Sequence, residues 1–428
     1  MNSNNIVREK SLIRYYLLIL LCLITWINPN ALPPMPIRLV YLFLVVYPVL
    51  TRAKFLFPII FCTLVTISMA RYAPSYMVST PIYVVVALLI INIVSPPSRA
   101  EYKTPVHLLV MSIYMMLVNF FSGFEFKEAC LTFLSAFLLY RYINFSQKSV
   151  KAFMSSFIII AFVLSVEYLL VGKNFTEAYS TSEIERMGWM DPNVFGCIIG
   201  MGIIVIAIVY LYQLFTFKFF NVIMVGSLIV CVIAFLLNAS RGASLALFLA
   251  VGTLIFISPV KKVIKISAFI STATLVVIMY WLGYFDNLIF RMSIENAETG
   301  GERTIIWATK IAAFLGNNTP LISRIFGLGD NEACFLGYGY YLGFHSDYVA
   351  MFVKYGFIGA ALLIYLLIYP LKIATNNKII IMVITLYLSL CVFSLDLINS
   401  GHIFFFYLYL FLLLLGKSSN LKNINNNV

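Results

Sequence analysis

His345, which stands beside a predicted helix start, is a candidate catalytic residue in this chain. The segment GFHSDYVAMFVKYGFIG covers residues 343–359 and leads into a long apolar run. Ser346 or Asp347 can cap the first helical turn, which places His345 just outside the helix N-terminus. The positive end of a helix disfavours an imidazolium, and a general base must be a neutral imidazole. A histidine bonded to the backbone at a membrane interface has the same setting, so both interpretations stay open.

Two arginines stand at predicted helix starts, where an anion is stabilised. Arg241 lies in the turn NASRG of residues 238–242, in which Gly242 allows a ligand to approach the backbone. Arg303 follows Gly-Gly-Glu and begins another helical segment. Backbone N–H groups at a helix start form an anion pocket together with a guanidinium group. A plain turn and a loop helix whose charges reach to the interface are the alternatives.

The segment that begins at Arg303 has two distinct faces if it is helical, because residues three and four apart share a face. The first face is apolar and consists of Ile305, Ala308, Ala312 and Leu315. The second face consists of Arg303, Trp307, Lys310 and Phe314. This pattern predicts a helix that lies on the membrane, with cationic residues among aromatic ones.

The segment RMGWMDPN, residues 186–193, leads into a further apolar run. Asp191 can cap this helix, and Pro192 suits its first position. Trp189 can stack on a sugar ring or belong to the aromatic belt of the membrane interface. Arg186 adds one more guanidinium group to the same loop.

Several common catalytic motifs are missing from the sequence. We find no Walker loop, no dinucleotide fingerprint, no His-Glu-x-x-His and no Ser-His-Asp arrangement. Six of the seven cysteines lie in or at the edges of apolar runs, so no zinc spacing or disulfide framework is present. The sequence therefore predicts no metal and no cofactor.

Membrane-spanning helices must position these residues. Of the 428 residues, 62% are apolar and 11% are charged, and the mean hydropathy is +0.97. A soluble domain would carry about a quarter charged residues. Soluble enzymes and disordered proteins are thus excluded, and long unbroken apolar runs exclude a transmembrane β-barrel.

The predicted fold class is an all-α polytopic membrane protein with about 14 (12–14) transmembrane helices. The apolar windows are 12–28, 38–51, 55–70, 81–94, 105–121, 128–143, 152–171, 193–215, 219–237, 243–258, 264–285, 347–369, 379–397 and 402–416. The first window lacks a signal-peptide cleavage site, so we expect a retained anchor.

Charge predicts the orientation of these helices. With both termini in the cytoplasm, the inner segments carry 18 basic and two acidic residues, which gives a net charge of +16. The outer segments then carry a net charge of −4. Lys and Arg are retained on the cytoplasmic side, so every inner loop agrees with this topology. The topology thus explains the net positive charge of the chain, and nucleic-acid binding is not needed to explain it. Seven of the twelve arginines lie on the outer side, where guanidinium groups can grip phosphate oxygens.

The predicted organisation has six parts, with one large outer loop. They are N-terminal spans (1–171), an outer loop (172–192), central spans (193–285), the large outer loop (286–346), C-terminal spans (347–416) and a cytoplasmic tail (417–428). Only the large loop is long enough to fold over a site. We find no inverted repeat in the sequence.

Four segments, taken in order, resemble the bacterial O-antigen polymerase and ligase superfamily. They are MGWMDPNVFG at a span start, ASRGASLALF, ERTIIW in the large loop and HSDYVAMFVKYGFIG before the next span. The resemblance covers about residues 185–360. HSDY followed by YGFIG is more similar to polymerases, because ligases more often have His-Asn at this point.

The resemblance implies a GT-C-like fold and a metal-independent inverting glycosyltransferase at the periplasmic face of the bacterial inner membrane. The donor would be an oligosaccharide on undecaprenyl pyrophosphate, and a chain-length regulator protein is a further partner that the family allows. His345 would be the general base. Arg241, Arg303, Arg186 and Arg324 would bind the pyrophosphate.

The sugars would occupy the aqueous side of a cleft beside the large loop, and the polyprenyl tail would lie in lipid. Candidate sugar-binding residues are Trp189, Tyr338, Tyr341 and Asp347, with Tyr340 and Phe344 along the same path. Tyrosines in glycine-rich loops are also often structural.

Two other functions agree with a polytopic basic protein. An O-antigen ligase would transfer finished polymer to the lipid A core. A lipid-linked glycan flippase would show internal repeats and polar residues near the middle of its spans, whereas this chain concentrates polar residues in one outer loop.

Overall fold

The computed structural model describes residues 105–122, 128–140, 146–171, 192–212, 214, 218–238, 240–258, 262–281, 283, 303–340, 342–395 and 403–418. All regular structure within these residues is helical, which confirms the all-α prediction. The predicted spans 12–28, 38–51, 55–70 and 81–94 lie outside the described residues, as does nearly all of the loop 172–192.

Each predicted span from residue 105 onward coincides with a helix. These helices are α5 (Val106–Phe121), α6 (Glu128–Tyr140), α7 (Gln147–Val171), α9 (Pro192–Leu211), α10 (Lys218–Asn238), α11 (Arg241–Ile257), α12 (Lys262–Trp281), α17 (Asp347–Ile373), α18 (Lys378–Ser394) and α19 (Ile403–Lys417). Within the described residues, three segments are long and apolar enough to cross a membrane, namely Ser149–Val166, Asn193–Leu211 and Asp347–Ile373. Six further apolar segments, in α5, α6, α10, α11, α18 and α19, are described over shorter lengths, so the total of about 14 spans stays a prediction.

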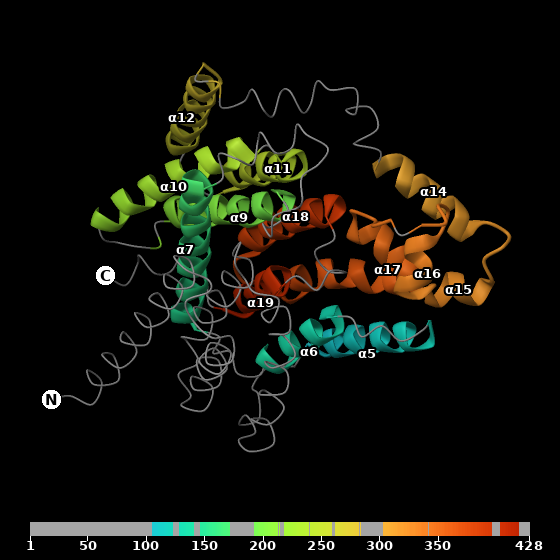
Figure 1. Ribbon diagram of the computed structural model, residues 1–428. Helices are drawn as coiled ribbons and strands as arrows, with labels where there is room; N and C mark the ends of the chain where they lie inside the picture. Colours follow the sequence, from blue (N-terminus) through green and yellow to red (C-terminus); the bar gives the residue numbers. More distant parts are fainter. Residues whose placement is uncertain are drawn as a thin grey trace, which may run out of the picture.

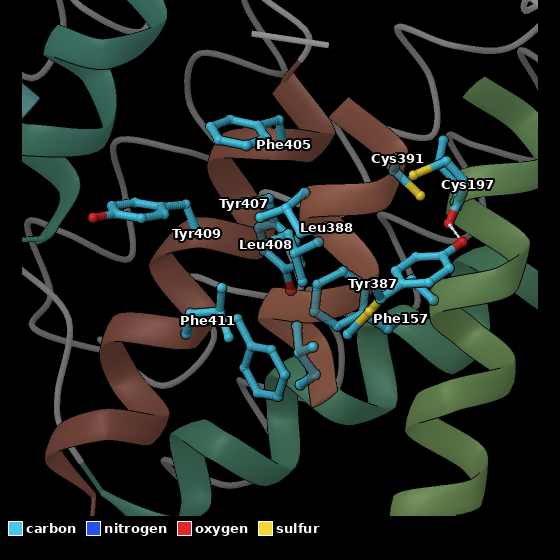
Figure 2. Close-up of a cluster of buried hydrophobic side chains, with 14 of the residues drawn as sticks. Phe157, Cys197, Tyr387, Leu388, Cys391, Phe405, Tyr407, Leu408, Tyr409 and Phe411 are labelled. Atoms are coloured by element: carbon cyan, nitrogen blue, oxygen red, sulfur yellow. Dashed lines mark hydrogen bonds between the residues drawn. The ribbon is translucent and has the colours of Figure 1, made fainter. Parts of the chain in front are cut away.

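Helix α19 lies at the centre of the main hydrophobic core. Its residues 405–415 are buried on every side, as expected for a helix that is apolar all round. Aromatic rings of α6 and α7 pack on it, including Phe133 against Phe406 at 4.6 Å and Phe153 against Tyr407 at 4.7 Å between centroids. Figure 2 shows this core.

Helices α9 and α11 pack beside α18 (Figure 1). The buried residues of α11 are Ala243, Ser244, Ala246, Ala250 and Leu254, and the small side chains of the alanines and the serine allow the helices to approach closely. Tyr387 of α18 donates a hydrogen bond to the carbonyl of Cys197 in α9 at 2.7 Å (Figure 2). These contacts fix the end of α18 relative to the starts of α9 and α11.

The described part of the predicted large loop contains three short helices, which gather at one end of the molecule (Figure 1). They are α14 (Arg303–Leu315), α15 (Leu321–Phe326) and α16 (Gly329–Phe335). A second hydrophobic cluster, which includes Phe314, Phe344 and Val353, joins them to the first part of α17.

Helix α17 is broken at Gly356, a feature that the hydropathy pattern did not predict. Gly356 has a φ of 65°, and the carbonyl of Ile325 lies where a side chain would be. Two carbonyls near the break find other donors. Leu328 N–H bonds to Val353 at 3.3 Å, and the Tyr114 hydroxyl bonds to Tyr355 at 2.7 Å. The break thus lets the loop helices pack closely against α17.

We expect Gly202→Ala to destabilise the protein and Gly252→Ala to leave it unchanged or more stable. Alanine favours a helix by about 1 kcal/mol over glycine at either position. At Gly202 the new methyl group would overlap Ala161 of α7, and overpacking costs about 1–3 kcal/mol. At Gly252 no described atom lies within 4 Å of the added carbon. Thermal unfolding of both variants in detergent measures the difference, and equal Tm values would contradict this packing of α7 on α9.

Candidate functional site at the end of helix α18

The C-terminal end of α18 is the point where several predicted site residues meet. The last carbonyls of a helix have no partner within it and must find donors elsewhere. The Nη1 of Arg303 donates to the Ser394 carbonyl at 3.1 Å. The backbone N–H of Asp347 donates to the Leu395 carbonyl at 3.0 Å. The starts of α14 and α17 are therefore tied to the same two residues.

The start of α11 reaches this point from another direction. A side chain on Gly242 would collide with Ser394, so only glycine allows this close approach. Arg241, the neighbour of Gly242 and the first residue of α11, is half-buried. Ser240 donates from its Oγ to the Oδ1 of Asn193 at 3.0 Å, which adds the start of α9.

Four helix starts thus surround the end of one helix. The N-terminal turns of α9, α11, α14 and α17 each carry a partial positive charge. Two of these turns begin with an arginine, at positions 241 and 303. A guanidinium carries five N–H donors, so the bond to Ser394 orients Arg303 without exhausting its capacity to bind an anion. The arrangement can stabilise a phosphate or pyrophosphate group.

Aromatic side chains hold the segment that precedes α17. The indole Nε1 of Trp307 donates to the carbonyl of Phe344 at 2.6 Å. Trp307 also contacts Phe393 edge-on at 5.3 Å, and Tyr348 lies 6.1 Å from Phe393, measured between ring centroids. These contacts connect α14, the end of α18 and the start of α17.

His345 is exposed and has an unusual backbone conformation. Its φ is 52°, in the left-handed region that non-glycine residues seldom adopt. Its Nε2 lies 3.9 Å from the position that a side-chain carbon on Gly343 would occupy. Residues held in such conformations cluster at functional sites, where surrounding contacts enforce them. Here those contacts are at Phe344 and Asp347, on both sides of the histidine.

The structure does not bring Arg324 to this point. Its Nη2 donates to the Gly316 carbonyl at 2.7 Å, beyond the C-terminal end of α14. At 1.5 Å per residue, α14 separates its first and last residues by about 18 Å. Arg324 is therefore a cap for the far end of α14.

The structure describes two of the predicted sugar-binding residues, Tyr338 and Asp347. Tyr338 is half-buried, with its ring 5.7 Å from that of exposed Tyr340. Asp347 is fully buried, so its side chain lies within the protein beneath the His345 segment. Arg186, Trp189 and Tyr341 lie outside the described residues.

Helix α14 presents the face that contains Lys310 to the protein. Lys310 and Phe314 are buried, whereas the apolar face of Ile305, Ala308, Ala312 and Leu315 is exposed. The Lys310 Nζ donates to the carbonyls of Ala333 and Cys334 at 3.0 and 2.8 Å. Burial lowers the pKa of Lys310.

The buried ion pair of Lys354 with Asp330 is a further feature of this region that the sequence did not identify. Lys354 is in an apolar run, where an ammonium group is costly unless it is paired. The hydropathy pattern does not indicate which carboxylate is its partner. Within the described residues, no group of three His, Cys, Asp or Glu side chains has an arrangement that fits a metal ion.

The fold and this site define a helical membrane protein in which two arginines and several helix starts gather at the end of one helix. Residues 226–364 match a family model described as O-antigen ligase. The matched segment contains Arg241, Arg303 and His345. The match confirms the resemblance to the O-antigen ligase and polymerase superfamily and supports a membrane glycosyltransferase-like enzyme of polysaccharide biosynthesis. The comparison with curated proteins found no match.

We expect the left-handed conformation of residue 345 to decide which substitutions it tolerates. Asparagine and glycine adopt this conformation readily, whereas a β-branched residue does not. His345→Val should therefore lower the stability by about 1–2 kcal/mol relative to His345→Gly. Thermal unfolding of His345→Asn, His345→Gly and His345→Val in detergent provides the test. A valine variant as stable as the glycine variant would contradict the backbone conformation.

Proposed function

We propose that this chain is a polysaccharide polymerase that joins undecaprenyl-pyrophosphate-linked repeat units of O-antigen or capsule. The observation that carries the proposal is the meeting of Arg303, the Arg241-Gly242 turn and the His345 segment at Ser394 and Leu395. These segments are far apart in the sequence, and the packing of α18 brings them together.

The guanidinium groups at positions 303 and 241 act on the leaving group. In the reaction, a hydroxyl oxygen of the acceptor sugar attacks the anomeric carbon of the donor from the face opposite the pyrophosphate. The bond between that carbon and the pyrophosphate oxygen breaks, and negative charge develops on the pyrophosphate. Fixed N–H donors and helix N-termini stabilise such charge in the transition state. The pyrophosphate already carries the energy of the transfer, so the proposal needs no nucleotide.

His345 acts as the general base in this proposal. It takes the proton of the acceptor hydroxyl while the new glycosidic bond forms. Its exposure gives a sugar access to the imidazole, and contacts on both sides hold the backbone that carries it. A well-placed base contributes about 10²- to 10⁴-fold in rate.

The proposal assigns the reaction to the periplasmic face of the inner membrane, with both termini in the cytoplasm. The charge pattern supports this orientation, because the starts of α9, α11 and α17 and the end of α18 all lie on the predicted outer side. The polyprenyl tail lies in the bilayer, and the pair of Tyr338 and Tyr340 faces the sugars. A chain-length regulator is a protein partner that this function would allow.

The description of the matched family favours a second candidate, an O-antigen ligase. Deletion of the chain separates the possibilities. Loss of a polymerase leaves single repeat units on the lipid A core, and loss of a ligase leaves polymer on the lipid carrier. Loss of a flippase leaves neither product. The Ser-Asp pair after His345 supports the polymerase.

We expect His345→Asn to abolish polymer while the protein stays in the membrane. Asparagine keeps the left-handed backbone but its amide cannot take up a proton. The rate of glycan extension should fall by about 10²- to 10⁴-fold. The assay is the length of glycans formed by purified protein in nanodiscs from lipid-linked repeat units. Normal glycan lengths with the asparagine variant would reject His345 as the base.

We expect Arg303→Lys to impair transfer much more than Arg324→Lys. Lysine keeps the positive charge but loses the planar fork that binds two phosphate oxygens. The loss at position 303 should be on the order of 10²-fold in kcat. At position 324 the change should affect stability only, because this side chain caps the far end of α14. Equal losses of kcat at both positions would contradict the assignment of the leaving-group site to the end of α18.

A further inference from the structure

We propose that Lys310 and Lys354 are positioning residues whose two ammonium groups hold the ring of Phe344 and thereby aim His345. The inference rests on the proposed function, in which His345 is the base. It concerns two buried cations that are bonded to the short helix α16.

The ring of Phe344 lies within reach of both cations. The Lys310 Nζ lies 4.6 Å from the ring centroid, and the Lys354 Nζ lies 5.1 Å from it. Cations within about 6 Å of a ring centroid are attracted to its face, more strongly where water is excluded. All three side chains are buried. The ring is therefore held by electrostatic attraction as well as by packing.

Helix α16 holds the two lysines in place. At its first turn, Asp330 pairs with Lys354. At its other end, the carbonyls of Ala333 and Cys334 accept hydrogen bonds from Lys310. Basic groups stabilise the C-terminal end of a helix, and acidic groups its N-terminal end. One short helix thus fixes the distance between both ammonium groups.

The position of Phe344 transmits this constraint to the base. Its carbonyl accepts the hydrogen bond from Trp307, and the next residue is His345 in its left-handed conformation. Two residues further on, Asp347 is bonded to Leu395. With the ring and carbonyl of Phe344 fixed, the backbone has little freedom to turn the imidazole away. A loss of alignment of about 1 Å can cost a hundredfold in rate.

Lys310 also stabilises the end of α16 through its hydrogen bonds to Ala333 and Cys334, so the test needs a variant that still folds. A buried ammonium is costly, and apolar residues of similar volume often replace buried charges without loss of stability. We therefore expect Lys310→Met to fold and to insert into the membrane. Phe344→Leu provides a second variant, because leucine keeps an apolar side chain but has no ring face for the cations.

The test uses the full chain in nanodiscs and lipid-linked oligosaccharide isolated from cells that lack this chain. Lys310→Met should lower kcat by about 10- to 100-fold with KM nearly unchanged. Ile305→Met, on the exposed face of the same helix, is the matched control and should keep the parent kcat. Phe344→Leu should lower kcat to a similar extent as Lys310→Met. If the Lys310→Met variant does not fold, the Phe344→Leu variant provides the test in its place.

The decisive measurement is the kcat of Lys310→Met in a protein that already carries His345→Asn. If Lys310 acts through His345, the residual rate should change by less than about two-fold there, because the two effects are not additive. The same loss in both backgrounds, or an unchanged kcat in the parent, would overturn the positioning role. A His345→Asn variant with the parent kcat would instead overturn the proposed function, so the two failures are distinguishable.

Discussion

The carbonyl groups at the end of α18 are the constraint on which this site depends. The last carbonyls of a helix have no partner within it, so donors from other segments can satisfy them. Arg303 and the backbone N–H of Asp347 supply these donors. The large loop and the start of α17 therefore have to lie at this point for α18 to be stable. Residues with quite different roles are brought together by this one requirement.

The same requirement gives the site its charge. The negative end of α18 attracts positive groups, and the helix starts that gather around it bring positive partial charge and two arginines. An anion bound there would interact with those groups more favourably than in water, because the surrounding helices lower the local dielectric constant. The proposed binding of a diphosphate is thus a property of how the helix ends are arranged. No single arginine in the sequence would establish it.

Hydropathy predicted the apolar helices that the structure describes, because lipid requires long apolar helices. The predicted starts at Arg241, Arg303 and Asp347 agree with helix starts in the structure. Three features were beyond this reasoning. The break at Gly356 depends on packing with Ile325, the partner of Lys354 is 24 residues away, and Arg324 caps a helix that ends nearby. Each depends on tertiary contacts between residues whose local sequence is unremarkable.

The two proposed roles place opposite demands on the protein, and the structure meets them in different ways. The leaving-group arginines need to be fixed before the reaction, because reorienting them would cost part of the stabilisation they provide. The base has to be accessible to a sugar, so it cannot be held by burial of its own side chain. Its neighbours are buried instead: the ring of Phe344 lies within reach of two cations, and Asp347 is bonded to the end of α18. An exposed imidazole on a fixed backbone satisfies both access and alignment, which explains why buried charge is found behind the histidine.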